Sequence, residues 1–108
     1  MTKNTYRNAF KMKLKSGFEA EYKKRHDEIW PELEVLLSES GVHDYSIFLD
    51  EETLTLFAFQ KVKVGFDNDY LPNHPIVKKW WAYMADIMET NPDHSPVSID
   101  LTPVFYFA

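Results

Sequence analysis

The first strong signal in the chain is an alternation of apolar and charged residues, which constrains that stretch to a β-strand. Between Tyr6 and Lys15, the apolar residues Phe10, Met12 and Leu14 are each followed by a lysine. A period of two places the apolar side chains on one face and the lysines on the other. This segment is therefore predicted to be a strand with one buried face and one wet face.

A helical period follows, and a proline interrupts it. After Ser16–Gly17, polar and apolar residues recur at helical spacing from Phe18 to Leu37, and Gly41 is a plausible C′ residue beyond them. Pro31 cannot donate a backbone hydrogen bond and disfavours helical geometry at Trp30. We therefore expect a first helix that ends at residue 27 or 28, an irregular step, and a second helix with Pro31 at or near its first position.

The rest of the chain predicts three more strands and one more helix. Strands are expected over Tyr45–Leu49 and Leu54–Val64, a helix from His74 or Pro75 to Glu89 with Met88 on its buried face, and an edge strand over Ile99–Phe107. This β-α-β-β-α-β order predicts one domain over residues 1–108. Its fold class is α+β, a ferredoxin-like antiparallel sheet with two helices on one face.

Two helices leave the other face of such a sheet uncovered. Four aromatic residues are candidates to line that face, namely Phe57, Phe59, Phe105 and Phe107. Burying them against a second copy of the chain would give a homodimer with an α/β-barrel-like centre. A homodimer is therefore the predicted assembly.

Charge and cysteine content exclude several classes of protein. The chain has 17 acidic and 12 basic residues and a net charge of −5, so its charge favours neither nucleic acid nor an anionic membrane as a partner. It has no cysteine, which excludes disulfides and thiol catalysis and is compatible with a reducing cytoplasm. The polar start, Met1–Asn8, lacks the apolar stretch of a secretory signal. We expect a soluble cytoplasmic protein.

The sequence carries no recognisable cofactor motif. It lacks a glycine-rich phosphate loop, a nucleophile elbow and a dinucleotide fingerprint. Its four histidines show no spacing typical of paired metal ligands. Neither a cofactor nor a metal is therefore predicted.

Tyr22 and His26 are the candidate chemical residues. Their four-residue spacing puts a phenol and an imidazole on one face of a helix, one turn apart. Taken singly, each is ordinarily a packing residue, but together they can bind a polar small molecule and move a proton on it. The predicted helix end after His26 favours imidazolium while burial opposes it, so the sequence leaves the protonation state open.

Trp80 and Trp81 form a second candidate group. Adjacent helix residues point about 100° apart, so only one of the two indoles can occupy the centre of a narrow core stripe. The other can serve as a platform for the apolar face of a sugar. Alternatively, both indoles fill a wide interface between helix and sheet.

Five separated motifs resemble the L-rhamnose mutarotase family in residue type, order and spacing, from about Phe10 to Tyr106. The motifs are Tyr22-x-x-Arg25-His26-x-x-Ile29-Trp30-Pro31-Glu32-Leu33, His43-Asp44-Tyr45-Ser46-Ile47, Trp80-Trp81-x-Tyr83-Met84, Asn91-Pro92-Asp93-x-Ser95-Pro96-Val97 and Val104-Phe105-Tyr106. Agreement of several motifs in one order makes coincidence a poor explanation.

The resemblance implies a dimeric ferredoxin-like enzyme that interconverts the α and β anomers of L-rhamnose without a cofactor. It implies that His26 is the proton donor and that the sugar is bound by Tyr22, Tyr45, Trp80 and Trp81. Imidazole suits such a reaction because a group with a pKa near neutral can both give and take a proton. The second proton carrier stays open between Asp93, Tyr45 and a water molecule.

Two other classes of function fit the predicted fold. Cofactor-free or haem-linked small oxygenases use the same dimeric arrangement, and aromatic residues with a histidine would suit their substrates too. The third possibility is a sugar-binding module without catalytic activity. The fold alone does not distinguish these classes.

Overall fold

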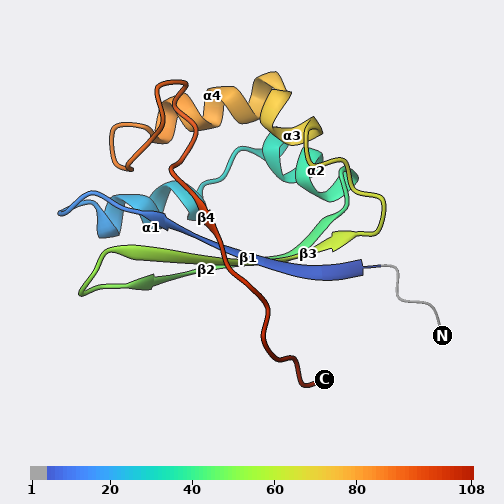
Figure 1. Ribbon diagram of the computed structural model, residues 1–108. Helices are drawn as coiled ribbons and strands as arrows, with labels where there is room; N and C mark the ends of the chain where they lie inside the picture. Colours follow the sequence, from blue (N-terminus) through green and yellow to red (C-terminus); the bar gives the residue numbers. More distant parts are fainter. Residues whose placement is uncertain (1–4) are drawn as a thin grey trace.

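The computed structural model describes residues 5–108, and the protein is an α+β structure. In chain order its elements are β1 (Thr5–Lys13), α1 (Glu19–Asp27), α2 (Pro31–Glu39), β2 (Val42–Asp50), β3 (Thr55–Lys63), α3 (Tyr70–Asn73), α4 (Pro75–Met84) and β4 (Ile99–Asp100). The strands form one antiparallel sheet in the order β2-β3-β1-β4. The helices lie on one side of this sheet, and the C-terminal segment runs out beyond its other side (Figure 1).

The alternation in β1 places its residues as predicted. Met12 and Leu14 are buried between the sheet and the helices, where they join residues of β3 and α4 in one apolar core. Leu56 and Ala58 of β3 stand opposite Met12 and Phe10 and face the same way. The core therefore lies on the helix-covered face, and the lysines of β1 point away from it.

The predicted break in the first helical region is confirmed. α1 ends at Asp27, Trp30 has an extended backbone with φ −61° and ψ 130°, and α2 begins with Pro31 at its first position. Gly41 follows α2 with a φ of +96°, and its carbonyl accepts a hydrogen bond from the Lys63 backbone N–H at 2.9 Å. Gly41 thus ends the helix and starts the pairing of β2 with β3.

The second helical region is shorter than predicted. α4 ends at Met84 and does not continue to Glu89, and Met88 forms an isolated β-bridge with Leu14 instead of lying on a helix face. The Lys15 N–H donates to the Ile87 carbonyl at 2.9 Å. Pairing with the end of β1 satisfies the backbone groups that a longer helix would have satisfied. Helical periodicity cannot predict this pairing, because the partner strand is distant in the sequence.

The prediction for the last strand was also wrong in length. Only Ile99–Asp100 pairs with β1, and the last link is the Leu101 N–H donating to the Ala9 carbonyl at 2.9 Å. Pro103 has no N–H to continue this ladder, and the chain beyond it leaves the sheet. Its place at the sheet edge is as predicted, and the structure shows that its neighbour is β1.

Substitution of Gly41 tests how closely the backbone at this residue must approach Lys63 of β3. A Cβ at this position would lie 2.8 Å from Cβ of Lys63, whereas a Cβ at Gly65, which has a similar φ of +89°, would meet nothing within 4 Å. We expect Gly65→Ala to lower the free energy of unfolding by about 1 kcal/mol through backbone strain alone. Gly41→Ala should cost roughly 1–2 kcal/mol more because of the clash. Equal losses in urea denaturation would show that the close approach is not constraining.

Candidate functional site

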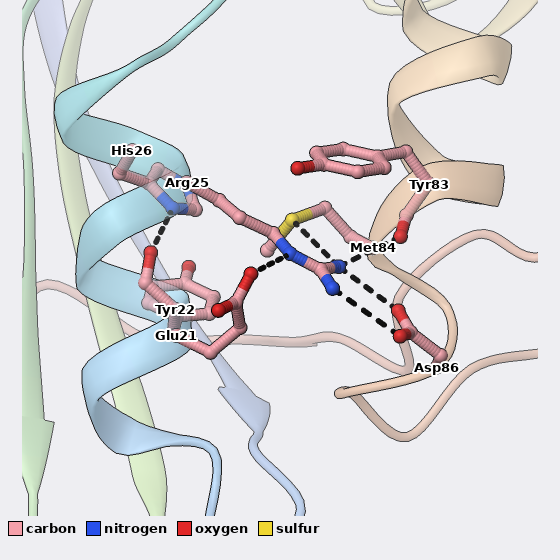
Figure 2. Close-up of polar contacts among 7 residues, drawn as sticks. All are labelled: Glu21, Tyr22, Arg25, His26, Tyr83, Met84 and Asp86. Carbon is pink, nitrogen blue, oxygen red and sulfur yellow. Dashed lines mark hydrogen bonds and ion pairs between the residues drawn. The ribbon is translucent and has the colours of Figure 1, made fainter.

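His26 lies in the last turn of α1, and Tyr22 lies one turn before it (Figure 2). Their rings stack with centroids 4.2 Å apart and planes 27° from parallel. Nδ1 of His26 is 3.0 Å from the backbone carbonyl oxygen of Tyr22. Because a carbonyl only accepts hydrogen bonds, Nδ1 carries the proton of the neutral imidazole, and Nε2 is left as an acceptor.

The surroundings of His26 favour its neutral form. Burial lowers the pKa of His26 below its ordinary value, against the hydrogen bond to the Tyr22 carbonyl and the charge of Asp27, which raise it. Neutral imidazole is therefore the main form near pH 7. Burial therefore outweighs the two local contacts that favour the imidazolium.

A cluster of three aromatic residues is joined to His26 through one member, Trp80. The Trp80 ring of α4 meets the imidazole edge-on, with centroids 5.5 Å apart. Trp30 lies 5.1 Å from Trp80, and Tyr83 lies 5.7 Å from each tryptophan. Trp30 and Tyr83 were not predicted as site residues. The signal for Trp30 was present, because a residue before a helix-starting proline is extended and leaves the helical stripe.

The tryptophan pair separates as adjacent helix positions require. Trp80 is buried in the core and contacts His26. Trp81 is partly buried against the same core, and within residues 5–108 it makes no ring contact with His26 or Tyr22. The structure therefore brings Tyr22, His26 and Trp80 together and does not bring Trp81 into contact with the His26 or Tyr22 ring.

A β-bulge aims Tyr45 at the helix-covered face. His43 stands opposite Lys61 and Ser46 opposite Phe59, so two residues of β2, Asp44 and Tyr45, share a single place in the ladder. Asp44 has a φ of 46° and forms an ion pair of 3.1 Å with Lys61. The extra residue changes the side on which Tyr45 projects.

Tyr45 and Tyr22 are both kept as neutral phenols. The Tyr45 ring meets the Phe10 ring edge-on, with centroids 6.4 Å apart. Burial raises the pKa of Tyr45 to about 12, although 39% of the residue remains exposed. Burial, and secondarily the nearby Tyr45, raises the pKa of Tyr22 well above its ordinary value. Both residues are therefore hydrogen-bond donors over the whole physiological pH range.

Asp93, one candidate for the second proton carrier, is occupied in a local turn. Its carboxylate accepts hydrogen bonds from the backbone N–H of Ser95, at 3.0 Å, and from the Ser95 hydroxyl. These bonds lower the pKa of Asp93, which is fully exposed. Within the described part of the chain, no contact joins this carboxylate to His26.

A surface hollow of about 350 Å³ lies away from this aromatic group. It is lined by Glu39, Ser40, Lys63, Val64, Gly65, Phe66, Asp67 and Tyr70, and none of the predicted site residues borders it. From Thr5 to Ala108, no three His, Asp or Glu side chains are grouped so that they could hold a metal ion. Nor does any helix in that range have the length and apolar character needed to cross a membrane.

Comparison with known proteins links this chain and its fold to one family. The family model for L-rhamnose mutarotase matches residues 7–107. An L-rhamnose mutarotase of Flavobacterium johnsoniae is 64% identical over 103 residues, which cover 95% of this chain and 96% of the relative. One of Brucella anthropi is 63% identical over 100 residues, covering 93% and 94%. The crystal structure of an L-rhamnose mutarotase from Formosa agariphila superposes with a TM-score of 0.88 at 61% identity, covering 95% of this chain and 99% of that chain.

The α+β fold and these matches place the chain among small carbohydrate isomerases. The chain belongs to the L-rhamnose mutarotase family. Family membership confirms the resemblance seen in the sequence. It also selects the isomerase from the three classes of function that the fold alone left open.

The protonation of His26 can be measured directly. Histidine NMR titration of the folded protein should give His26 a pKa below its ordinary value of 6.5, because burial disfavours the imidazolium. Below pH 6.5 the unfolded chain then binds a proton that the folded chain does not, so the free energy of unfolding should fall as the pH falls. His26→Gln should remove this part of the pH dependence. A titration midpoint above 6.5 would contradict the buried neutral form.

Proposed function

We propose that this chain interconverts the α and β anomers of L-rhamnose and that His26 moves the proton. The observation that carries the proposal is the neutral imidazole of His26, whose Nδ1–H is held by the Tyr22 carbonyl. Within residues 5–108 its Nε2 makes no hydrogen bond, so it is free to act on a ligand. Family membership supports the sugar and the reaction.

A single imidazole suffices for both proton transfers. Nε2 takes the proton of the anomeric hydroxyl, the bond between the anomeric carbon and the ring oxygen breaks as the aldehyde forms, and the imidazolium gives that proton to the ring oxygen. The aldehyde turns about the adjacent C–C bond, and the reverse steps close the ring on its other face. His26 is thus the proton donor to the ring oxygen, and a second protein carrier is not required.

The four other residues implied by the resemblance are proposed to bind the sugar. Tyr22 and Tyr45 stay protonated, so their hydroxyls can donate hydrogen bonds to the sugar without competing as bases. Trp80 contacts the imidazole, and its indole can present an apolar surface to the sugar beside it. Trp81, on the next position of α4, can extend that surface at the margin of the site.

We also propose a ferredoxin-like arrangement that dimerises through the open face of the sheet. The antiparallel order β2-β3-β1-β4 with helices on one side supports the arrangement. Phe59 is exposed on the open face and contacts Phe48, which is also exposed, at 5.9 Å. Phe105 and Phe107 are 82% and 83% exposed on a segment that extends beyond that face (Figure 1). Several exposed aromatic rings near one face are typical of a surface that binds another protein, and we propose that this protein is a second copy of the chain. A cytoplasmic location remains a prediction from the lack of cysteine.

Replacing His26 tests the proposed chemistry. His26→Gln should slow the exchange of L-rhamnose anomers, measured by saturation-difference NMR, by on the order of a hundredfold or more, because the group that both takes and gives the proton in this scheme is lost. His43→Gln is the matched control, since His43 is an exposed histidine of β2. The control should retain the rate of the unmodified chain.

Two outcomes would contradict this scheme at different levels. Unchanged exchange in His26→Gln would reject the role of His26, and exchange by the unmodified chain no faster than in buffer would reject the activity.

The pH dependence of the rate is a separate test. Because the neutral imidazole starts the cycle, kcat/KM should rise with pH through the lowered pKa of His26 and then level off. A fall of kcat/KM over this pH range would contradict the proposed order, in which His26 first takes the proton of the anomeric hydroxyl and then gives it to the ring oxygen.

The assembly can be tested by light scattering at micromolar concentration. The unmodified chain should have twice the mass of one chain, and Phe105→Ser combined with Phe107→Ser should shift it toward the monomer by removing exposed apolar area. Val35→Ser is the control, because Val35 is an exposed apolar residue on α2, in the helical layer. A clean monomer mass for the unmodified chain would reject the dimer.

A further inference from the structure

Arg25 connects the helix that carries His26 to the end of the helix that carries Trp80. Its guanidinium reaches from α1 to the turn after α4 (Figure 2). On its own helix, Nε donates to the Glu21 carboxylate at 2.8 Å. Across the gap, Nη1 donates to the Tyr83 carbonyl at 2.8 Å, and Nη1 and Nη2 donate to the two oxygens of Asp86 at 2.9 and 3.2 Å.

The surroundings of Arg25 differ from those of an ordinary surface ion pair. Only 11% of its side chain is exposed, and all three guanidinium nitrogens donate to protein acceptors. In the same helix, Lys23 forms an ion pair of 2.8 Å with Asp27, but those side chains are 78% and 61% exposed. Solvent-exposed ion pairs of that kind contribute little to stability. The planar guanidinium of Arg25, by contrast, binds acceptors on two elements at once and so fixes their relative orientation.

The acceptors of Arg25 lie where α4 ends. The Tyr83 carbonyl is near the last turn of α4, and a cation favours that end of a helix. Asp86 stands two residues beyond Met84, the last residue of α4, and the hydrogen bond from Arg25 is the main cause of its lowered pKa. This contact helps to explain why the chain leaves the helix at Met84.

Arg25 also touches the aromatic group of the site. Its guanidinium carbon lies 4.4 Å from the centroid of the Tyr83 ring. Tyr83 in turn contacts Trp80 and Trp30, and Trp80 contacts His26. A continuous set of contacts therefore leads from Arg25 through Tyr83 and Trp80 to His26, the residue next to Arg25 in the chain.

We propose that Arg25 is a positioning residue of this enzyme, which sets the distance between His26 on α1 and Trp80 on α4 by clamping the end of α4. The proposal rests on the proposed function, since the spacing matters only if a sugar binds beside these two groups, which contact each other. Arg25 acts through His26 and Trp80 and does not contact the reacting atoms. Lysine cannot replace it fully, because a single ammonium cannot reach Glu21, the Tyr83 carbonyl and both oxygens of Asp86 in one plane.

Removal of the clamp should lower activity and admit water to His26. Arg25→Met should reduce kcat/KM for L-rhamnose anomer exchange by about ten- to a hundredfold, since small displacements of catalytic groups cost that much. Arg25→Lys should recover part of this loss. In NMR titration, the His26 pKa should move up toward 6.5 in Arg25→Met, because burial is the main cause of its lowering. A merely stabilising contact would not move this midpoint.

Lys23→Met is the matched control, because it removes the same charge from the same helix at an exposed pair. It should leave both kcat/KM and the His26 midpoint unchanged. Asp86→Asn removes the same ion pair from the Asp86 side, so it can be measured even if Arg25→Met does not fold. The double variant Arg25→Met with Asp86→Asn should lose little more kcat/KM than Arg25→Met alone, since both changes remove one interaction.

The outcomes separate the two proposals. If Arg25→Met and Asp86→Asn lower only the melting temperature, while kcat/KM stays within about twofold and the His26 midpoint is unmoved, the positioning role is overturned. If the unmodified chain shows no anomer exchange, the proposed function fails. The titration then still decides whether Arg25 controls the surroundings of His26.

Discussion

The break between α1 and α2 is the constraint on which the site depends. In a continuous helix, Trp30 would lie one turn after His26 on the same face. Because Pro31 starts a new helix, Trp30 is extended and its ring lies against Trp80 and Tyr83 instead. His26 is left in the last turn of α1, stacked on Tyr22 on one side and meeting Trp80 edge-on.

Two opposing effects meet at His26, and their balance decides its chemistry. A helix C-terminus and a nearby carboxylate favour the imidazolium, while burial beneath aromatic rings favours the neutral ring. Burial prevails only while α1 and α4 stay close together. The contacts of Arg25 with Tyr83 and Asp86 hold these helices at that point, so the protonation of His26 depends on a residue that touches neither its ring nor the proposed sugar.

The two faces of the sheet differ in what covers them. The helix-covered face holds the core and receives Tyr45 through the bulge at Asp44. The open face carries Phe48 and Phe59, and the C-terminal segment adds two exposed phenylalanines beyond it. The proposed dimer would bury this second surface without touching the aromatic group around His26, so assembly and chemistry would be served by opposite sides of one sheet.

Local patterns were enough to predict the α+β class, the strand alternation in β1, the break at Pro31 and the shared face of Tyr22 and His26. Each of these depends on backbone chemistry or periodicity within a few residues. The end of α4, the short β4, the bulge before Tyr45 and the roles of Trp30, Tyr83 and Arg25 were not predicted. These features depend on partners distant in the chain: the end of β1 for Met88, β3 for Tyr45, and Asp86 for Arg25. The neutral state of His26 belongs with them, because burial is a property of packed elements and no short stretch of sequence contains it.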